Sequence, residues 1–278
     1  MRVFCFVCVL GCAWAGTLHA ESADEWFDRQ TDWHGFDQLH FRVADRSAWL
    51  VVPNDPLPER PWIWRARFPG YHDEIDVALV KQGFHLAYVD VAGLFGNLQA
   101  MHAGDAMYTF LTEQRGLAKQ PVLEGVSRGG LFVYHWLMRH PTNVACVYCD
   151  TPVLDIASWP GGKGTGLGSE RDWSLCRSAW NLSEAEATDF RKGPLHRAAP
   201  IIAKQGIPVL HIVSENDVVV PPSENSYVLR DQLRKSGHEM LVISVAEGTA
   251  QSHGHHFDHP AVGQVIRFIT EHGVQREN

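Results

Sequence analysis

The sequence lacks two features that mark common classes of protein: clusters of basic residues and a hydrophobic run long enough to cross a bilayer. It has 24 Lys and Arg against 32 Asp and Glu, a net charge of −8, whereas nucleic-acid binding needs grouped Lys and Arg to contact phosphates. The apolar run from Val3 to Leu10 is far shorter than the roughly 20 residues that span a bilayer as a helix. We therefore expect no nucleic-acid partner and no membrane span.

Cysteine is also scarce beyond the N-terminal segment. Of the six cysteines, only Cys146, Cys149 and Cys176 lie after residue 20. An odd number leaves at least one thiol without a partner in the same chain. Cys146 and Cys149 stand three positions apart in an apolar stretch, which favours small buried residues of a core strand over a redox pair or a zinc site.

The first twenty residues have the order of a secretory signal peptide. Arg2 precedes the apolar run, and mostly small residues follow it up to Ala20. This order predicts a leader at 1–20, cleaved after Ala20 or alternatively after Ala15, and a mature domain at 21–278. We expect a secreted or periplasmic protein.

A lipoprotein is the less favoured alternative, because Val9 to Cys12 resembles a lipobox only in part.

With 278 residues, 45% of them hydrophobic, the chain is long enough for one large domain with a full core. Strand-like and helix-like segments alternate along it. The predicted strands are 40–43, 48–53, 61–68, 84–91, 121–126, 143–149, 208–213 and 241–245. The predicted helices are 73–81, 100–117, 129–139, 224–235 and 261–272. This alternation predicts an α/β fold whose mostly parallel sheet is covered by helices on both faces.

One segment departs from the alternation. About 151–199 separates two predicted strands and contains Trp159 and Trp173. Loops of this length in a compact domain are usually functional, so we predict a lid insertion. Its glycine run at 161–166 does not have the GxxxxGK[ST] form of a phosphate loop, because Gly164 follows Lys163.

Ser127 is the candidate nucleophile. It lies in the segment 125–130, GVSRGG, which ends a predicted strand and begins a predicted helix. Flanking glycines allow the tight backbone turn that this position needs, and the helix N-terminus behind it favours developing negative charge. A GxSxG motif alone is weak evidence, and its place between strand and helix strengthens it.

A serine hydroxyl needs a base to remove its proton and an acid to orient that base. For a nucleophile at such a strand–helix turn, the acid and then the histidine follow along the chain. Asp217 comes soon after the predicted strand 208–213. Glu215 is a near rival and Asp155 a more distant one.

The loop before the last helix offers four histidines, at 253, 255, 256 and 259. We assign the base to His255, because a Gly-His pair before the final helix is typical of this loop, with His256 and His253 as alternatives. A catalytic zinc needs about three converging ligands. Adjacent His255 and His256 cannot easily point at one ion, and no HExxH motif occurs, so we predict no metal.

The oxyanion of the reaction needs backbone N–H donors. One donor is expected from Arg128, which follows the nucleophile. The other is expected from the loop after the strand 61–68, where we assign Phe68, with Arg67 as the alternative.

Several segments together resemble a family of secreted bacterial α/β-hydrolases found among polysaccharide-degrading enzymes, some of which are pectin methylesterases. The resemblance covers about residues 60–270. It is carried by 125–130, Trp64 to Phe68, 151–156, 158–162, Asp217 to Pro221, Glu224-Asn225 and 254–256. It implies the α/β-hydrolase fold and a triad at Ser127, Asp217 and His255. The chain departs from the family at Phe257-Asp258-His259, where Pro-His-Ser-Leu is usual.

The GxSRxG form also resembles the elbow of glucuronoyl esterases, which implies that the side chain of Arg128 helps to hold the oxyanion. A guanidinium there would attract a substrate carboxylate. Pairing of Arg128 with Glu124 or Asp150 is an equal alternative. Arg67 and Trp159 are further candidates for substrate binding, although tryptophans such as Trp159 and Trp173 more often serve packing.

The sequence thus predicts a serine hydrolase that cleaves a carboxylic ester, on a small molecule or a polysaccharide, with a carbohydrate or uronic acid as the favoured substrate. A serine peptidase of the same fold and a non-catalytic carbohydrate-binding protein are the alternatives. The chemistry needs no cofactor. The oligomeric state is left open.

Overall fold

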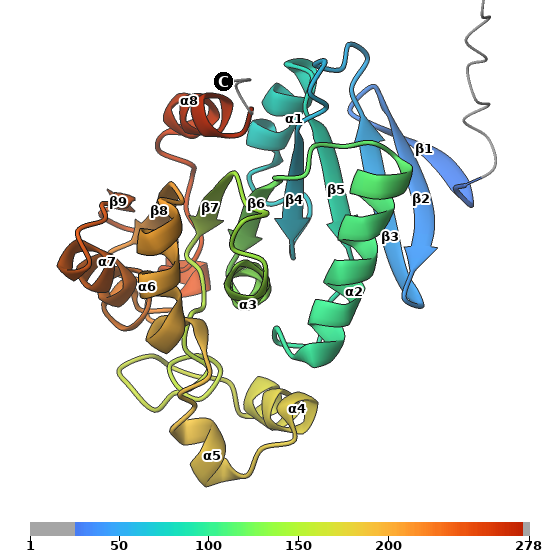
Figure 1. Ribbon diagram of the computed structural model, residues 1–278. Coiled ribbons are helices and arrows are strands. Elements are labelled where there is room, and N and C mark those ends of the chain that lie inside the picture. The colour runs from blue at the N-terminus through green and yellow to red at the C-terminus, as the bar shows by residue number, and fades with distance from the viewer. Residues whose placement is uncertain (1–25, 275–278) are drawn as a thin grey trace, which may run out of the picture.

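The computed structural model describes residues 26–274. Within them, one nine-stranded sheet has the order β1-β2-β3-β5-β4-β6-β7-β8-β9 (Figure 1). The strands are β1 (Arg29–Trp33), β2 (Phe36–Val43), β3 (Arg46–Val52), β4 (Trp62–Ala66), β5 (His85–Val89), β6 (Val122–Val126), β7 (Cys146–Asp150), β8 (Val209–Ser214) and β9 (Leu241–Val245). The α-helices are α1 (Asp73–Lys81), α2 (Leu98–Thr109), α3 (Gly129–Arg139), α4 (Glu170–Trp180), α5 (Glu184–Thr188), α6 (Pro194–Gln205), α7 (Ser226–Lys235) and α8 (Val262–His272).

The sheet is mostly parallel, as predicted. β1, β2 and β3 form an antiparallel meander, and β3 joins β5 antiparallel. From β5 onward the neighbouring strands are parallel. Every residue of β4 to β8 is buried, because a parallel sheet packs helices on both faces. Because these strands run parallel, their carboxyl ends lie at one edge of the sheet, where the connecting loops meet.

Helices cover both faces of this sheet (Figure 1). On one face, α1 and α8 pack together through residues such as Leu79 and Phe268. On the other, α2, α3 and α6 bury a larger cluster that includes Met107, Trp136 and Ile202. No helix of the residues that the structure describes is long and apolar enough to span a membrane. The signal peptide predicted at 1–20 lies outside these residues.

The segment 151–199, predicted as a lid, contains α4, α5 and the first part of α6. α4 and α5 lie together below the sheet in Figure 1, and residues such as Trp173 and Cys176 join Trp159 in a separate small core. By contrast, α6 packs against α3 and α7 and belongs to the main core. The glycine run is anchored, since the Thr165 hydroxyl donates to Glu224 over 2.6 Å.

The structure adds elements that the sequence patterns did not indicate. β1 is polar and mostly exposed, so it shows no apolar alternation. The helix predicted at 100–117 is α2 followed by one π-helical segment, η1 (Phe110–Gln114). The short 3-10 helices are η2 (Pro222–Glu224) and η3 (Ala250–Ser252). Cys146, Cys149 and Cys176 are buried and free.

Candidate active site

Ser127 occupies the turn between β6 and α3, in a left-handed backbone conformation with φ 51°. Three backbone bonds hold it there. Ser127 N–H donates to Asp150 O over 2.9 Å, and Ser127 O accepts the N–H groups of Val153, over 2.9 Å, and of Gly130, over 3.0 Å. Holding a non-glycine residue at positive φ costs on the order of 1–3 kcal/mol. The surrounding sheet therefore stabilises a strained turn that presents the hydroxyl.

Two glycines after Ser127 are required by close packing. A Cβ on Gly129 would overlap the carbonyl oxygen of Ala66, and one on Gly130 would lie 2.6 Å from the Cβ of Pro152. These contacts press the first turn of α3 against β4 and against the strand-end loop after β7. The fold thus requires glycine at positions 129 and 130, because a side chain at either position would clash with its neighbours.

We predict that Gly129→Ala destabilises the protein by about 1–3 kcal/mol, the usual cost of overpacking, and lowers the reactivity of Ser127. Chemical denaturation and the rate of labelling by a fluorophosphonate measure the two effects. Gly263→Ala in α8 is the matched control, because its added Cβ meets nothing closer than 3.8 Å. It should be neutral or stabilising by up to about 1 kcal/mol. Equal behaviour of the two variants would refute the steric explanation.

The structure brings Ser127, His255 and Asp217 into one hydrogen-bonded line. His255 Nε2 lies 3.0 Å from Ser127 Oγ, and His255 Nδ1 lies 2.7 Å from Asp217 Oδ2. The carboxylate is fully buried, and its Oδ1 accepts the N–H groups of Val219 and Val220, each over 2.8 Å. A carboxylate fixed in this way holds the proton on Nδ1 and leaves Nε2 free to accept the serine proton.

The rival residues point elsewhere. Glu215 accepts the hydroxyl of Tyr227, and Asp155 accepts the N–H of Ala157 over 2.9 Å. His256 lies beside Tyr71 on the pocket wall, with 5.3 Å between ring centroids. The geometry therefore selects Asp217 and His255 among the candidates.

Gly254 explains why the histidine follows a glycine. Its φ is +84°, and an added Cβ would overlap the carbonyl oxygen of Asn216. The loop that carries His255 thus packs directly on the loop that carries Asp217. A larger residue at position 254 would separate His255 from Asp217.

A pocket of about 340 Å³ opens beside Ser127. Its walls include Phe68, Tyr71, Arg128, Trp159 and His255. Phe68 and Arg128, the predicted sources of oxyanion donors, both line it together with Ser127. The predicted roles of their N–H groups stay predictions.

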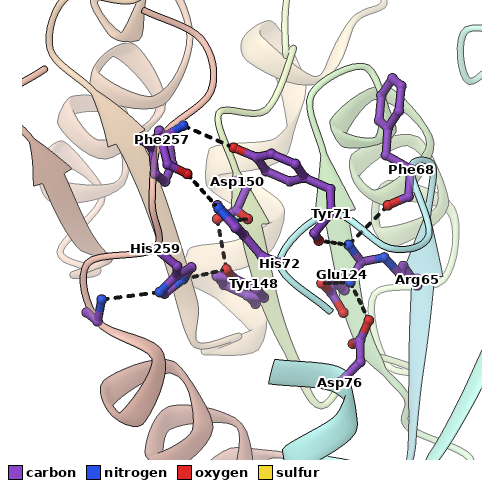
Figure 2. A network of polar contacts seen from close by, with 11 residues as sticks. Arg65, Phe68, Tyr71, His72, Asp76, Glu124, Tyr148, Asp150, Phe257 and His259 are labelled. Carbon is purple, nitrogen blue, oxygen red and sulfur yellow. Dashed lines mark hydrogen bonds and ion pairs between the residues drawn. The ribbon is translucent and has the colours of Figure 1, made fainter. Parts of the chain in front are cut away.

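The loop that carries Phe68 is held by a buried arginine that sequence reasoning missed. Arg65 donates to the carbonyl oxygens of Phe68, over 3.2 Å, and of Tyr71 (Figure 2). It is held in turn by Glu124, over 2.7 Å, and by Asp76. A single charged residue in each of the buried strands β4 and β6 was the available signal, because such residues are rarely buried without a partner.

Electrostatics in this cluster follow from burial. Burial alone would lower the pKa of Arg65, but the carboxylates of Asp76 and Glu124 outweigh it and raise that pKa. Burial also raises the pKa of Asp76 and of Glu124, although Arg65 opposes the shift. The arginine thus remains charged while one cation serves two buried carboxyl groups.

Arg128 pairs with neither Glu124 nor Asp150, the partners considered from the sequence. Its Nη1 lies 3.2 Å from Asp172 Oδ1, on the lid helix α4. Its guanidinium also lies over Trp159, 5.0 Å from the ring centroid. Burial lowers the pKa of Arg128 while Asp172 partly restores it. Arg128 therefore joins the turn at Ser127 to α4.

The other predicted substrate-binding residues lie close by. Arg67 lies 4.0 Å from Asp90 and over the ring of Phe68, 4.9 Å from its centroid. Trp159 is almost fully buried and forms part of the pocket wall. Trp173 packs inside the lid and donates to Glu184 over 2.9 Å.

A cluster that could hold a metal ion consists of His72, Asp150 and His259, whose ligand atoms lie within 4.8 Å of one another. Only His259 comes from the histidine-rich loop. Each ligand atom already has a hydrogen-bond partner within the protein. This pairing favours a proton network over a metal centre.

No family model matches the sequence, and no curated protein sequence matches it. Solved structures do match. The Pyrococcus horikoshii acylaminoacyl peptidase is 16% identical with a TM-score of 0.65, covering 89% of this chain and 45% of its own. A puromycin hydrolase is 21% identical with a TM-score of 0.57, covering 75% of this chain and 35% of its own.

The Porphyromonas gingivalis dipeptidyl peptidase 4 is 14% identical with a TM-score of 0.62, covering 85% of this chain and 36% of its own. The chain has the α/β-hydrolase fold. It spans less than half the length of these structures. Within that fold, the turn that carries Ser127 and the two strand-end loops that carry Asp217 and His255 come together at one edge of the sheet.

Proposed function

We propose that the protein is a serine hydrolase that forms an acyl-enzyme on Ser127. The observation that carries the proposal is the line of hydrogen bonds from Ser127 through His255 to buried Asp217. His255 accepts the hydroxyl proton as Oγ attacks the acyl carbon, and the N–H groups of Arg128 and Phe68 hold the oxyanion. The bond to the leaving group then breaks, and His255 passes it the proton.

Water completes the cycle. It attacks the acyl-enzyme while His255 takes one of its protons, and the same proton then returns to Ser127 as the acid departs. Asp217 keeps the imidazole in the required tautomer throughout.

Labelling with a fluorophosphonate tests this proposal. We expect one adduct, located at Ser127 by mass spectrometry of the digested protein. A chain that stays unlabelled, or is labelled elsewhere, would favour the alternative of a non-catalytic carbohydrate-binding protein.

For the substrate, the structural neighbours favour the peptidase alternative over the carbohydrate ester. The neighbours named above are peptidases or hydrolyse puromycin, and they carry no indication of a carbohydrate substrate. We therefore propose an amide or peptide bond as the first class to test. Peptidyl and aminoacyl anilides report it through the released amine.

A carboxylic ester of an acidic molecule is the second candidate. Arg128 lines the pocket, and the guanidinium groups of Arg67 and Arg128 both lie over the ring of Phe68, 4.9 and 5.7 Å from its centroid. Two cations beside the nucleophile would attract a carboxylate. Release of methanol or acetate from pectin, acetylated xylan and methyl glucuronate distinguishes this class from peptides.

We predict that Arg128→Leu lowers kcat/KM for substrates with a carboxylate by about 10- to 100-fold, the range for a lost hydrogen bond between charged groups. Matched neutral substrates should change by only a few fold. Arg177→Leu, on α4, the helix that carries Asp172, with its own partner Glu184, is the control. A uniform loss on both substrates would assign Arg128 to holding the lid.

We also propose export of the protein, from the signal-like order of residues 1–20. N-terminal sequencing of protein recovered from the medium or periplasm should begin after Ala20. A chain that retains Met1 there would contradict it.

A further inference from the structure

His72 joins the loop after β4 to the loop that carries the catalytic histidine. It stands immediately before α1, in a left-handed conformation with φ 54°. Its Nδ1 lies 2.7 Å from Asp150 Oδ2, at the end of β7, and its Nε2 lies 2.8 Å from the carbonyl oxygen of Phe257 (Figure 2). Phe257 is two residues beyond His255. One side chain thus connects three strand-end segments beneath the active site.

Both partners of this imidazole are acceptors. A carbonyl oxygen only accepts, so Nε2 must carry a hydrogen. The direction of the bonds at Asp150 follows from its other neighbours. The N–H of Ala261 donates to His259 Nδ1 over 3.2 Å, so His259 Nε2 carries the hydrogen of the neutral ring. That nitrogen lies 3.0 Å from the hydroxyl of Tyr148.

Tyr148 then donates its own hydrogen to Asp150 Oδ1 over 2.8 Å. Burial raises the pKa of Tyr148 well above its ordinary value, which keeps this hydrogen in place. Burial lowers the pKa of His259, which keeps that ring neutral. Oδ1 of Asp150 therefore accepts, and if Oδ2 accepts as well, His72 Nδ1 carries a hydrogen too.

We propose that His72 is a doubly protonated imidazolium that holds the loop of His255 in its reactive position, so that losing one proton from His72 releases that loop. His72 is a positioning residue, because it touches neither Ser127 nor the pocket. The inference rests on the proposed function only in that the reactivity of Ser127 reports it.

Several titratable groups face His72 from the surrounding elements. They are Asp150 and Tyr148 on β7, Glu74 on α1, Tyr71 beside it, and His256 and His259 on the histidine loop. Burial alone would lower the pKa of His72, but the hydrogen bond and charge of Asp150, the carbonyl of Phe257 and the charge of Glu74 outweigh it. The net effect raises the pKa of His72 above 6.5.

Loss of one proton affects the two sides of the His72 ring differently, because Nδ1 faces Asp150 and Nε2 faces the carbonyl of Phe257. A neutral His72 keeps its hydrogen on Nδ1, opposite Oδ2 of Asp150. Its Nε2 lone pair then faces the lone pairs of the Phe257 carbonyl, so the contact turns from attractive to repulsive. Since the folded-state pKa is raised, this stabilisation is fully present below pH 6.5 and is lost as pH rises through the folded pKa.

The test is the pH dependence of the fluorophosphonate reaction rate in the full chain. For the wild type, we expect the rate, divided by that of His72→Asn at the same pH so that the contribution of the base His255 cancels, to fall about tenfold as pH rises through the pKa of His72, the usual cost of one charged hydrogen bond. His72→Gln places a permanent N–H donor near the position of Nε2, so its rate, divided in the same way, should lack this fall. His72→Asn keeps a donor only toward Asp150, so its rate should be about tenfold below that of the wild type at low pH.

His140→Gln is the matched control, because His140 pairs with Asp105 over the same 2.7 Å at a site remote from the pocket. It should follow the wild-type profile. A fall that persists unchanged in His72→Gln, or a wild-type rate in His72→Asn, would overturn the inference.

Nitrogen NMR of the histidine rings provides a measurement that does not depend on reactivity. In folded wild type or Ser127→Ala at pH 5.5, below the ordinary pKa of histidine, both nitrogens of His72 should be protonated, and a neutral ring would overturn the inference even if variants at position 72 fail to fold. A wild type that does not react with the fluorophosphonate contradicts the proposed function instead, and the NMR result still decides the charge of His72.

Discussion

Replacing Ser127 by alanine is expected to lower kcat by on the order of 10⁴- to 10⁶-fold, because the nucleophile and its base act as one unit. His255→Ala should cost a similar factor. The double variant should be no slower than the slower single variant, since either change already removes acyl-enzyme formation. Steady-state rates on whichever anilide or ester the wild type cleaves measure all three.

His253→Asn is the control for these variants. His253 lies in the same loop with φ 55°, a conformation that asparagine tolerates, and its ring takes no part in the line from Ser127 to Asp217. Its rate should stay within a few fold of the wild type. Losses that multiply in the double variant, or appreciable turnover by Ser127→Ala, would contradict the assigned triad.

Arg65→Met is expected to lower the free energy of unfolding by about 3–5 kcal/mol, because it leaves the buried carboxyl groups of Asp76 and Glu124 without their cation. Arg65 is 1% exposed, so water cannot replace it. Urea unfolding followed by circular dichroism measures the loss. Arg234→Met, which breaks an exposed pair with Asp231, should change stability by less than about 1 kcal/mol.

A combined variant separates the structural and the functional roles of this arginine. Replacing Asp76 and Glu124 by leucine together with Arg65→Met should recover most of the lost stability, because no uncompensated charge stays buried. It should not recover activity, since the carbonyl groups of Phe68 and Tyr71 still lack their donor. Full recovery of both stability and activity would show that Arg65 is not needed to hold the loop that carries Phe68.

The sequence predicted most of the sheet because its central strands are continuous apolar runs between helical patterns. The predicted ranges of α1, α3 and β9 agree with the structure. It could not predict β1, whose polar residues pair with β2 without burying an apolar face. It predicted the lid as a loop because the lid helices are short or largely exposed.

By itself, the sequence determined the strand–turn–helix around Ser127 and the order in which acid and histidine follow it. Those features depend on local spacing and on the parallel topology, which brings strand ends to one edge. Only the tertiary structure decided that His255, rather than His253 or His256, faces Ser127. That choice depends on the close packing of Gly254 on Asn216, a contact between loops 38 positions apart.

The partners of Arg128 and His72 were likewise decided by the tertiary structure. Arg128 meets Asp172 on the lid, and His72 meets Phe257 across 185 positions. The hydrophobic periodicity of the sequence does not indicate such pairs, because they depend on how separate loops pack at the edge of the sheet. The sequence thus determined which residues could perform the chemistry, and the packing of the loops decided which of them meet.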